Sequence, residues 1–179
     1  MENLSVFDPW HAGGLNVTTA GKLSAIFTLG DEAKNYAEMI YPGNRQFIAT
    51  INSAQHSWTL YPGKNFFARD IFINDDSTTQ QAAVVKTSAF LARISIHFAD
   101  GQTFNFKYPT VFSKTQRWYN DQFGNVLTTE GSKFTVKPKL KVVPGQSAFK
   151  NNDQLLLMIF ISVHMVYMRK VYTGFVDDK

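Results

Sequence analysis

Four lysines in one short segment have the spacing in this chain that most clearly suggests a chemical role. They occupy the odd positions of KFTVKPKLKV, residues 133–142: Lys133, Lys137, Lys139 and Lys141. The even positions are mostly apolar, and successive side chains of a strand point to opposite faces, so a strand here would present four ammonium groups on one face. Such a face suits anionic lipid headgroups or another polyanion, at about 1 kcal/mol per basic residue near an anionic membrane.

A structural interpretation of the same lysines is also open. Charged side chains on the edge strand of a sheet prevent edge-to-edge pairing with another chain. Pro138 fits an edge position because it has no N–H to donate to a neighbouring strand. The sequence therefore predicts either an anion-binding stripe or an edge-protecting face.

The other residues that could do chemistry form no motif. The histidines are scattered, without a metal-ligand spacing such as HxxxH: His11, His56, His97 and His164. Cysteine is absent, which excludes disulfides, thiolate zinc sites and a cysteine nucleophile. Five aspartates lie beside predicted turns, where Asp bonds its own backbone: Asp70, Asp75, Asp76, Asp100 and Asp121. We therefore predict no catalytic residue, no metal site and no cofactor.

Composition places the chain among globular proteins. Its 179 residues suit a single domain, and 44% of them are hydrophobic. The formal charge of +4 permits an anionic partner without requiring one. KTQRWY, residues 114–119, combines basic and aromatic residues, but we interpret it as a strand with Trp118 facing inward and expect no nucleic-acid partner. The N-terminus has no secretory pattern, so we expect a cytoplasmic protein.

Residues 22–143 mostly alternate between apolar and polar, with turn residues at short intervals, which is typical of an antiparallel β-meander. The clearest hairpin is ISIHFADGQTFNFKY, residues 94–108, which turns at Asp100-Gly101. We interpret residues 1–21 as an N-terminal lead-in that can end in a short strand, and 22–179 as one domain. The segment GDEAKNYAEMIYPG departs from the alternation and predicts a short helix from Asp31 to a point before Pro42.

The most apolar stretch of the chain lies near its C-terminus, over residues 155–168. Asn151, Asn152 or Asp153 can cap it, so we predict a helix over about 153–170. Fourteen residues at about 1.5 Å each reach roughly 21 Å, short of the roughly 30 Å hydrocarbon core of a bilayer. A helix that is apolar all round must be enclosed on all sides. The sequence therefore predicts a closed antiparallel β-barrel that encloses a C-terminal hydrophobic helix.

This order of elements resembles the tubby-like C-terminal fold of tubby proteins, plant LURP-one-related proteins and phospholipid scramblases. The resemblance rests on the hairpin at 94–108, the turn YNDQFGNVL and the apolar segment NNDQLLLMIFISVHMVYMRK, and it covers about residues 22–172. It implies a twelve-stranded barrel around a central hydrophobic helix. Tubby proteins bind phosphoinositides through basic residues of the barrel, so the resemblance also implies a lipid-binding module.

Three functions follow as hypotheses. The first is a non-enzymatic binding or scaffold module that contacts anionic phospholipid peripherally, with no transmembrane span. The second is a structural or assembly protein that contacts other proteins and has no lipid role. The third is a small-molecule-binding barrel or an enzyme, which is weaker because a helix should fill the lumen that a ligand would need.

Overall fold

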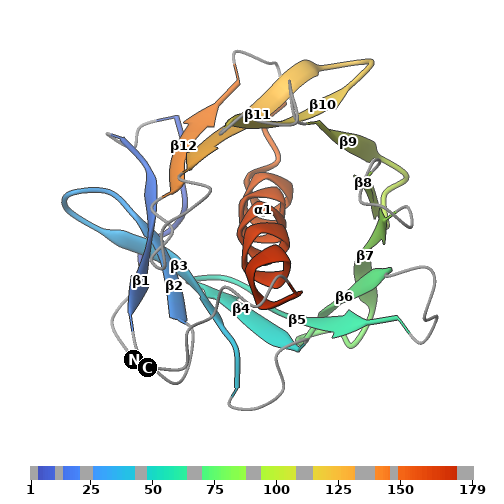
Figure 1. Cartoon of the computed structure of the whole chain (residues 1–179), viewed down its shortest axis with the longest axis horizontal. Coiled ribbons are helices and arrows are strands. Elements are labelled where there is room, and N and C mark those ends of the chain that lie inside the picture. Colours follow the sequence, from blue (N-terminus) through green and yellow to red (C-terminus); the bar gives the residue numbers. More distant parts are fainter. Residues whose placement is uncertain are drawn as a thin grey trace.

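The protein is a closed β-barrel with one helix running through it (Figure 1). The computed structural model describes residues 4–10, 14–20, 26–42, 48–63, 70–87, 94–107, 115–131, 140–145 and 149–172. Within these ranges, twelve antiparallel strands and the C-terminal helix α1 (Asn152–Tyr172) account for the regular structure. The predicted fold class, a closed antiparallel barrel with an enclosed C-terminal helix, is therefore confirmed.

The strands follow one another around the barrel in chain order, and β1 pairs with β12 to close it. Their bounds are β1 (Asn16–Ala20), β2 (Ile26–Gly30), β3 (Asn35–Ile40), β4 (Ala49–Ser53), β5 (Ser57–Pro62), β6 (Ile71–Asp75), β7 (Gln81–Thr87), β8 (Ile94–Phe98), β9 (Thr103–Lys107), β10 (Thr115–Asn120), β11 (Gly124–Gly131) and β12 (Leu140–Pro144). In most strands buried and exposed positions alternate, as expected for a wall with one face on the core.

The barrel begins before the predicted boundary at residue 22. β1 lies inside the segment 1–21 that was interpreted as a lead-in, and it pairs with β2 and β12. The partner of Val17 on β12 is Leu140, more than a hundred residues away along the chain. A short strand at the end of the lead-in is therefore present, and its pairing with β12 makes it part of the barrel.

The predicted short helix after Asp31 is wrong, because the segment forms a turn and then β3. The Asp31 carboxylate accepts hydrogen bonds from the backbone N–H groups of Ala33 and Lys34, both at 2.8 Å, which closes a tight turn. β3 then pairs with β2 on one side and β4 on the other. Sheet pairing on both sides outweighs the weak helix preference of Ala37 and Met39.

α1 is enclosed on all sides over its first half. Every residue from Gln154 to Met165 is buried, which excludes a helix with one wet face. Asn151 caps the helix, because its side-chain oxygen accepts a hydrogen bond from the N–H of Gln154 at 3.1 Å. Within the part of the chain that the structure describes, no helix is long and apolar enough to cross a membrane.

Two hydrogen bonds join α1 to the barrel wall inside the apolar core. Trp118 Nε1 donates to Ser162 Oγ at 2.8 Å, so Trp118 faces inward as predicted. Tyr41 Oη and His164 Nδ1 lie 2.7 Å apart, which provides the partner that a buried imidazole requires. Because hydrogen bonds are directional, these two polar contacts help to set the rotation of the helix about its axis.

Gly145 allows the chain to turn from β12 toward α1, because it passes very close to β11. Its N–H donates to Val126 O at 2.8 Å, and a Cβ added there would lie 1.9 Å from Asn125 O. We expect Gly145→Ala to lower the free energy of unfolding by about 2 kcal/mol or more, because a backbone atom has to move. Urea unfolding tests this, with the exposed neighbour Gln122→Ala as the control. Equal unfolding midpoints for the two variants would contradict it.

Candidate functional site

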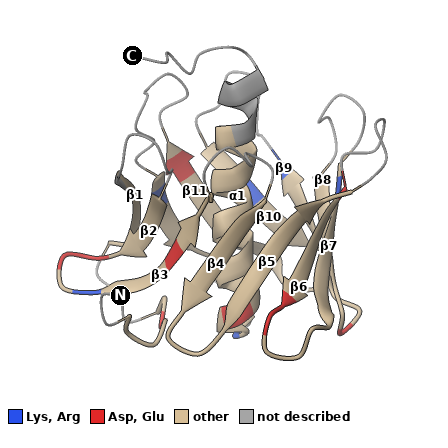
Figure 2. Ribbon diagram, turned by 90° about the horizontal axis from the view of Figure 1, so that it is seen from below, with Lys and Arg blue, Asp and Glu red and all other residues tan. Residues whose placement is uncertain are grey.

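The chain order explains how the two ends of the barrel are built. In an up-and-down barrel successive connections alternate between ends, so five tight turns lie at the end where α1 begins (Figure 2). These turns follow β2, β4, β6, β8 and β10. We call this the turn end and the end toward which α1 runs the opposite end.

The turn end is acidic. The N-terminal segment also lies there, since Asn152 Nδ2 at the start of α1 donates to Phe7 O at 3.1 Å. The acidic residues of this end are Asp8, Asp31, Glu32, Asp75, Asp76, Asp100, Asp121 and Asp153. With Lys34 and Lys150 the formal charge of this end is −6, and because the whole chain has +4, the rest of the chain carries +10.

The exposed cations of the described strands lie on the outer wall toward the opposite end. They are Lys86, Lys107, Arg117 and Lys141, each within three residues of the end of its strand. Lys107 and Arg117 are direct cross-strand partners, an arrangement of like charges that is usually destabilising. The described carboxylates outside the turn end are Glu38, Asp70 and Glu130, of which Glu130 lies opposite Lys141.

The structure describes only one of the four lysines that the sequence places in a stripe, Lys141. Lys133, Lys137 and Lys139 lie outside the described residues. Lys141 is exposed between the buried Leu140 and Val142, which is the alternation that the sequence predicts. The edge-protecting interpretation fails at Lys141, because its partners are Asn16 on β1 and Glu130 on β11 and barrel closure leaves no edge there.

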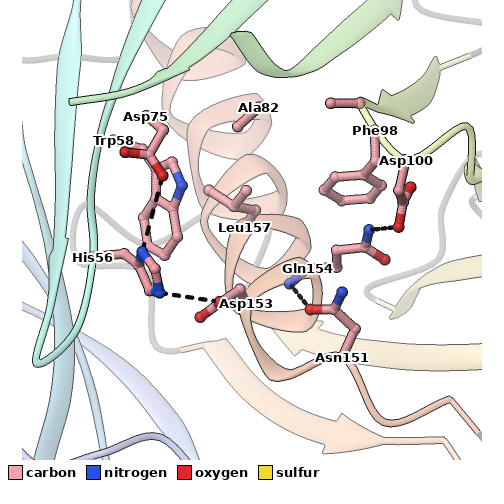
Figure 3. Close-up of a pocket in the computed structure, with 11 residues that line it drawn as sticks. His56, Trp58, Asp75, Ala82, Phe98, Asp100, Asn151, Asp153, Gln154 and Leu157 are labelled. Atoms are coloured by element: carbon pink, nitrogen blue, oxygen red, sulfur yellow. Dashed lines mark hydrogen bonds and ion pairs between the residues drawn. The ribbon is translucent and has the colours of Figure 1, made fainter. Parts of the chain in front are cut away.

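A pocket of about 210 Å³ opens at the turn end, beside the first turn of α1 (Figure 3). His56 stands between two carboxylates in it: Nε2 lies 3.4 Å from Asp153 Oδ2, and Nδ1 lies 3.9 Å from Asp75 Oδ2. The imidazole also stacks on Trp58, with ring centroids 5.4 Å apart. Because these residues come from β5, β6, the turn before β5 and α1, the pocket exists only in the folded barrel.

Hydrogen bonds hold the carboxylates of the pocket in place. The Ser77 hydroxyl bonds to Asp75 and holds the pKa of that carboxyl below its usual range, and the backbone N–H groups of Ser77 and Thr78 act in the same direction. Asp100 accepts from Gln102 N at 3.0 Å and from Gln154 Nε2 at 2.8 Å. Asp75 and Asp100 thus perform the predicted turn chemistry and also line the pocket.

Carboxylates, side-chain amides, one histidine and apolar side chains line the pocket. No Ser, Thr or Lys lines it, and within the described ranges no group of three His, Asp or Glu side chains is arranged to hold a metal ion. Sequence reasoning treated His56 as structural and assigned no role to Gln154. The only available signal was the turn position of the aspartates, since residues 56, 75, 100 and 153 are far apart in the chain.

The interior of the barrel is filled by side chains around His164, which is 4% exposed. Burial lowers the pKa of His164 to about 4 and raises that of Tyr41 well above its usual range, so both groups are neutral at pH 7. Tyr41 packs on Tyr167 of α1 at a centroid distance of 4.5 Å. The His164–Tyr41 contact therefore fixes the helix, and the ligand-accessible surfaces are the outer wall and the ends of the barrel.

Comparisons with protein-family models, with curated proteins and with solved structures give no match for this chain. The resemblance to the tubby-like fold therefore stays a prediction. The structure adds two features to this resemblance: the acidic turn end and the pocket that opens there.

Proposed function

We propose that the protein is a non-enzymatic binding module that associates peripherally with anionic lipid surfaces through the opposite end of its barrel. The observation that carries the proposal is the acidic turn end: its described residues have a formal charge of −6 in a chain whose other residues have +10. A negatively charged surface repels this acidic end, so it orients the molecule before contact with the acidic end pointing away.

The filled barrel supports a surface role over a catalytic one. Barrels that hold small ligands do so in the lumen, and here Leu156, Phe160 and Val163 of α1 are fully or almost fully buried inside it. The strand wall is closed and its inner face is packed against the helix. A partner of this protein therefore meets the outer surface.

The connecting segments between the described strands are basic in sequence. The strand ends that meet at the opposite end are joined by 21–25, 43–47, 64–69, 88–93, 108–114 and 132–139, which lie outside the described residues. Together these segments contain nine Lys or Arg and no Asp or Glu. They include Lys133, Lys137 and Lys139, so the lysine stripe predicted from sequence belongs to this larger basic set.

Exposed aromatics accompany the cations. Tyr61 and Phe72 are direct cross-strand partners on β5 and β6, and they are 40% and 37% exposed. Both lie within two residues of the strand ends at the opposite end. Aromatic side chains suit the headgroup region of a bilayer, so this pair is compatible with shallow contact beside the charges.

We expect binding to vesicles of phosphatidylcholine that contain phosphatidylserine, and no binding to phosphatidylcholine alone. The attraction is Coulombic, so raising salt from about 0.1 M to about 1 M shortens the Debye length from about 10 Å to about 3 Å and should release most of the protein. Co-sedimentation at both salt concentrations measures this. Equal binding to both lipids, or none to either, would reject the lipid role and favour the assembly protein that contacts other proteins.

A further inference from the structure

The outer wall of the barrel has an apolar corner at the opposite end, where β5 ends and β6 begins. Tyr61 and Phe72 are cross-strand partners there, and Val84 on β7 is the next outward residue of the same row. Tyr61 and Phe72 are 40% and 37% exposed, and Pro62 beside them is exposed as well. Single exposed apolar side chains are ordinary, but neighbouring exposed aromatics at one end of a barrel indicate a contact surface. We call Tyr61, Pro62 and Phe72 the aromatic corner.

The backbone beneath the aromatic corner is held by sheet pairing. Pro62 is the partner of Ile71, and one residue further toward the opposite end the N–H of Gly63 donates to Asp70 O at 2.6 Å. The Phe72 ring lies beside Gly63, because a Cβ added to this glycine would be 3.3 Å from Phe72 Cε2. Both rings therefore project from a fixed backbone, and an aromatic side chain has only two χ angles to order on binding.

The size of the aromatic corner favours a lipid surface over a protein partner. Exposed fractions of 40% and 37% for two side chains of roughly 200 Å² each give about 150 Å² of exposed aromatic surface. A stable protein interface buries about 800 Å² on each partner, with a well-packed apolar centre. A bilayer needs no complementary shape, and aromatic side chains concentrate in its headgroup region. A small aromatic projection therefore suits a lipid surface.

The charges around the aromatic corner identify the kind of lipid. Lys86 is exposed on β7, two residues beyond Val84 toward the opposite end. Residues 64–69, which join β5 to β6 and lie outside the described residues, contain one Lys and one Arg and no carboxylate. The half-buried Asp70 directly before β6 is the described carboxylate that flanks the corner in the chain. The balance is basic, which suits an anionic bilayer.

We propose that the aromatic corner enters the headgroup region of an anionic bilayer when the protein binds there. Insertion rests on the proposed function, because Coulomb attraction to the bilayer has to bring the corner to the surface first. Tyr61 suits this depth, since its ring is apolar and its hydroxyl is polar. Phe72, its cross-strand partner, adds apolar area at the same depth. The contact is short-ranged and lies at one defined place on the barrel.

Quenching of tryptophan fluorescence by brominated lipid tests the insertion directly. The probes are the full chain with Phe72→Trp or with Val143→Trp, mixed with phosphatidylserine vesicles whose phosphatidylcholine has brominated acyl chains. Val143 is 38% exposed on the outer wall and lies one residue before the end of β12, which leads toward the start of α1 and the turn end. Wild type supplies the background of the three native tryptophans. We expect quenching above this background for Phe72→Trp and none above it for Val143→Trp.

A second pair of variants tests the place of contact through charge. Asp70→Asn removes a carboxylate beside the aromatic corner, so we expect the affinity for phosphatidylserine vesicles at low salt to rise about fivefold. Asp121→Asn removes the same charge from the turn end, beyond the Debye length from the bilayer, and should change the affinity less than about twofold. Co-sedimentation measures both affinities.

The outcomes separate the insertion from the proposed function. Co-sedimentation of wild type, together with equal quenching of the two tryptophan variants or equal affinities of the two asparagine variants, would overturn the insertion and leave peripheral binding intact. Failure of wild type to co-sediment with phosphatidylserine vesicles at low salt would reject both.

Discussion

Replacing Lys107 and Arg117 together by glutamine is expected to lower the affinity for phosphatidylserine vesicles about 30-fold at low salt. Each basic residue near an anionic surface contributes about 1 kcal/mol, and about 2 kcal/mol corresponds to this ratio. The fold should tolerate the change, because both side chains are exposed and lie directly opposite each other across β9 and β10. Removing one or both like charges relieves repulsion in the sheet, so the unfolding midpoint should stay equal or rise.

A charge-matched control identifies the end of the barrel that meets the lipid. Lys34 and Lys150 lie at the turn end, and changing both to glutamine removes the same formal charge. Repulsion of the acidic turn end keeps these lysines away from the surface, beyond the Debye length of about 10 Å at 0.1 M salt. The double change should therefore lower the affinity for vesicles less than about threefold. Similar losses in the two double variants would show that only net charge matters.

Acidification from about pH 7 to about pH 4 is expected to cost the protein about 3 kcal/mol of stability through His164 alone. The imidazole has a pKa of about 4 in the folded protein and about 6.5 when unfolded. Between these values the unfolded state binds a proton that the folded state does not, so stability is complete above about pH 6.5 and falls toward pH 4. Each unit of separation contributes about 1.4 kcal/mol.

The variant that isolates this effect removes both hydrogen-bonding partners, His164→Phe with Tyr41→Phe, so that no buried polar atom is left without a partner. Urea unfolding at three pH values between about 7 and about 4 should show a shallower loss of stability than in wild type. The carboxyl pKa values of Asp31 and Asp75 are lowered in the folded protein, so their protonation destabilises the fold mainly below about pH 4. Both residues are present in wild type and in the variant, so they do not affect the comparison. Parallel losses of stability would show that His164 is protonated in the folded state.

The enclosed helix could be predicted because its sequence is compatible with only one environment. A segment that is apolar on every side and too short to span a bilayer must be surrounded by protein, and a chain of hairpins can do that by closing into a barrel. Alternation in the strands placed Trp118 and Phe104 on the core face for the same local reason.

Elements whose stability comes from distant partners were the hardest to predict, so β1 was placed outside the domain and β3 was predicted as a helix. β1 is short and polar, and it is held by β12 at the other end of the chain. β3 carries Ala, Glu and Met, which favour helix locally, and it becomes a strand because β2 and β4 flank it. Local propensity is worth a few tenths of a kcal/mol per residue and cannot compete with pairing on both sides.

The sequence by itself determined the period of the strands, the apolar helix and the net charge of +4. Only the tertiary structure decided that eight of the acidic residues lie at one end of the barrel. In an antiparallel meander alternate connections lie on the same end, so acidic turns spaced along the whole chain gather around the first turn of α1. The same folding brings His56, Asp75, Asp100 and Asp153 to one pocket, because barrel closure joins residues that no short stretch of sequence contains together.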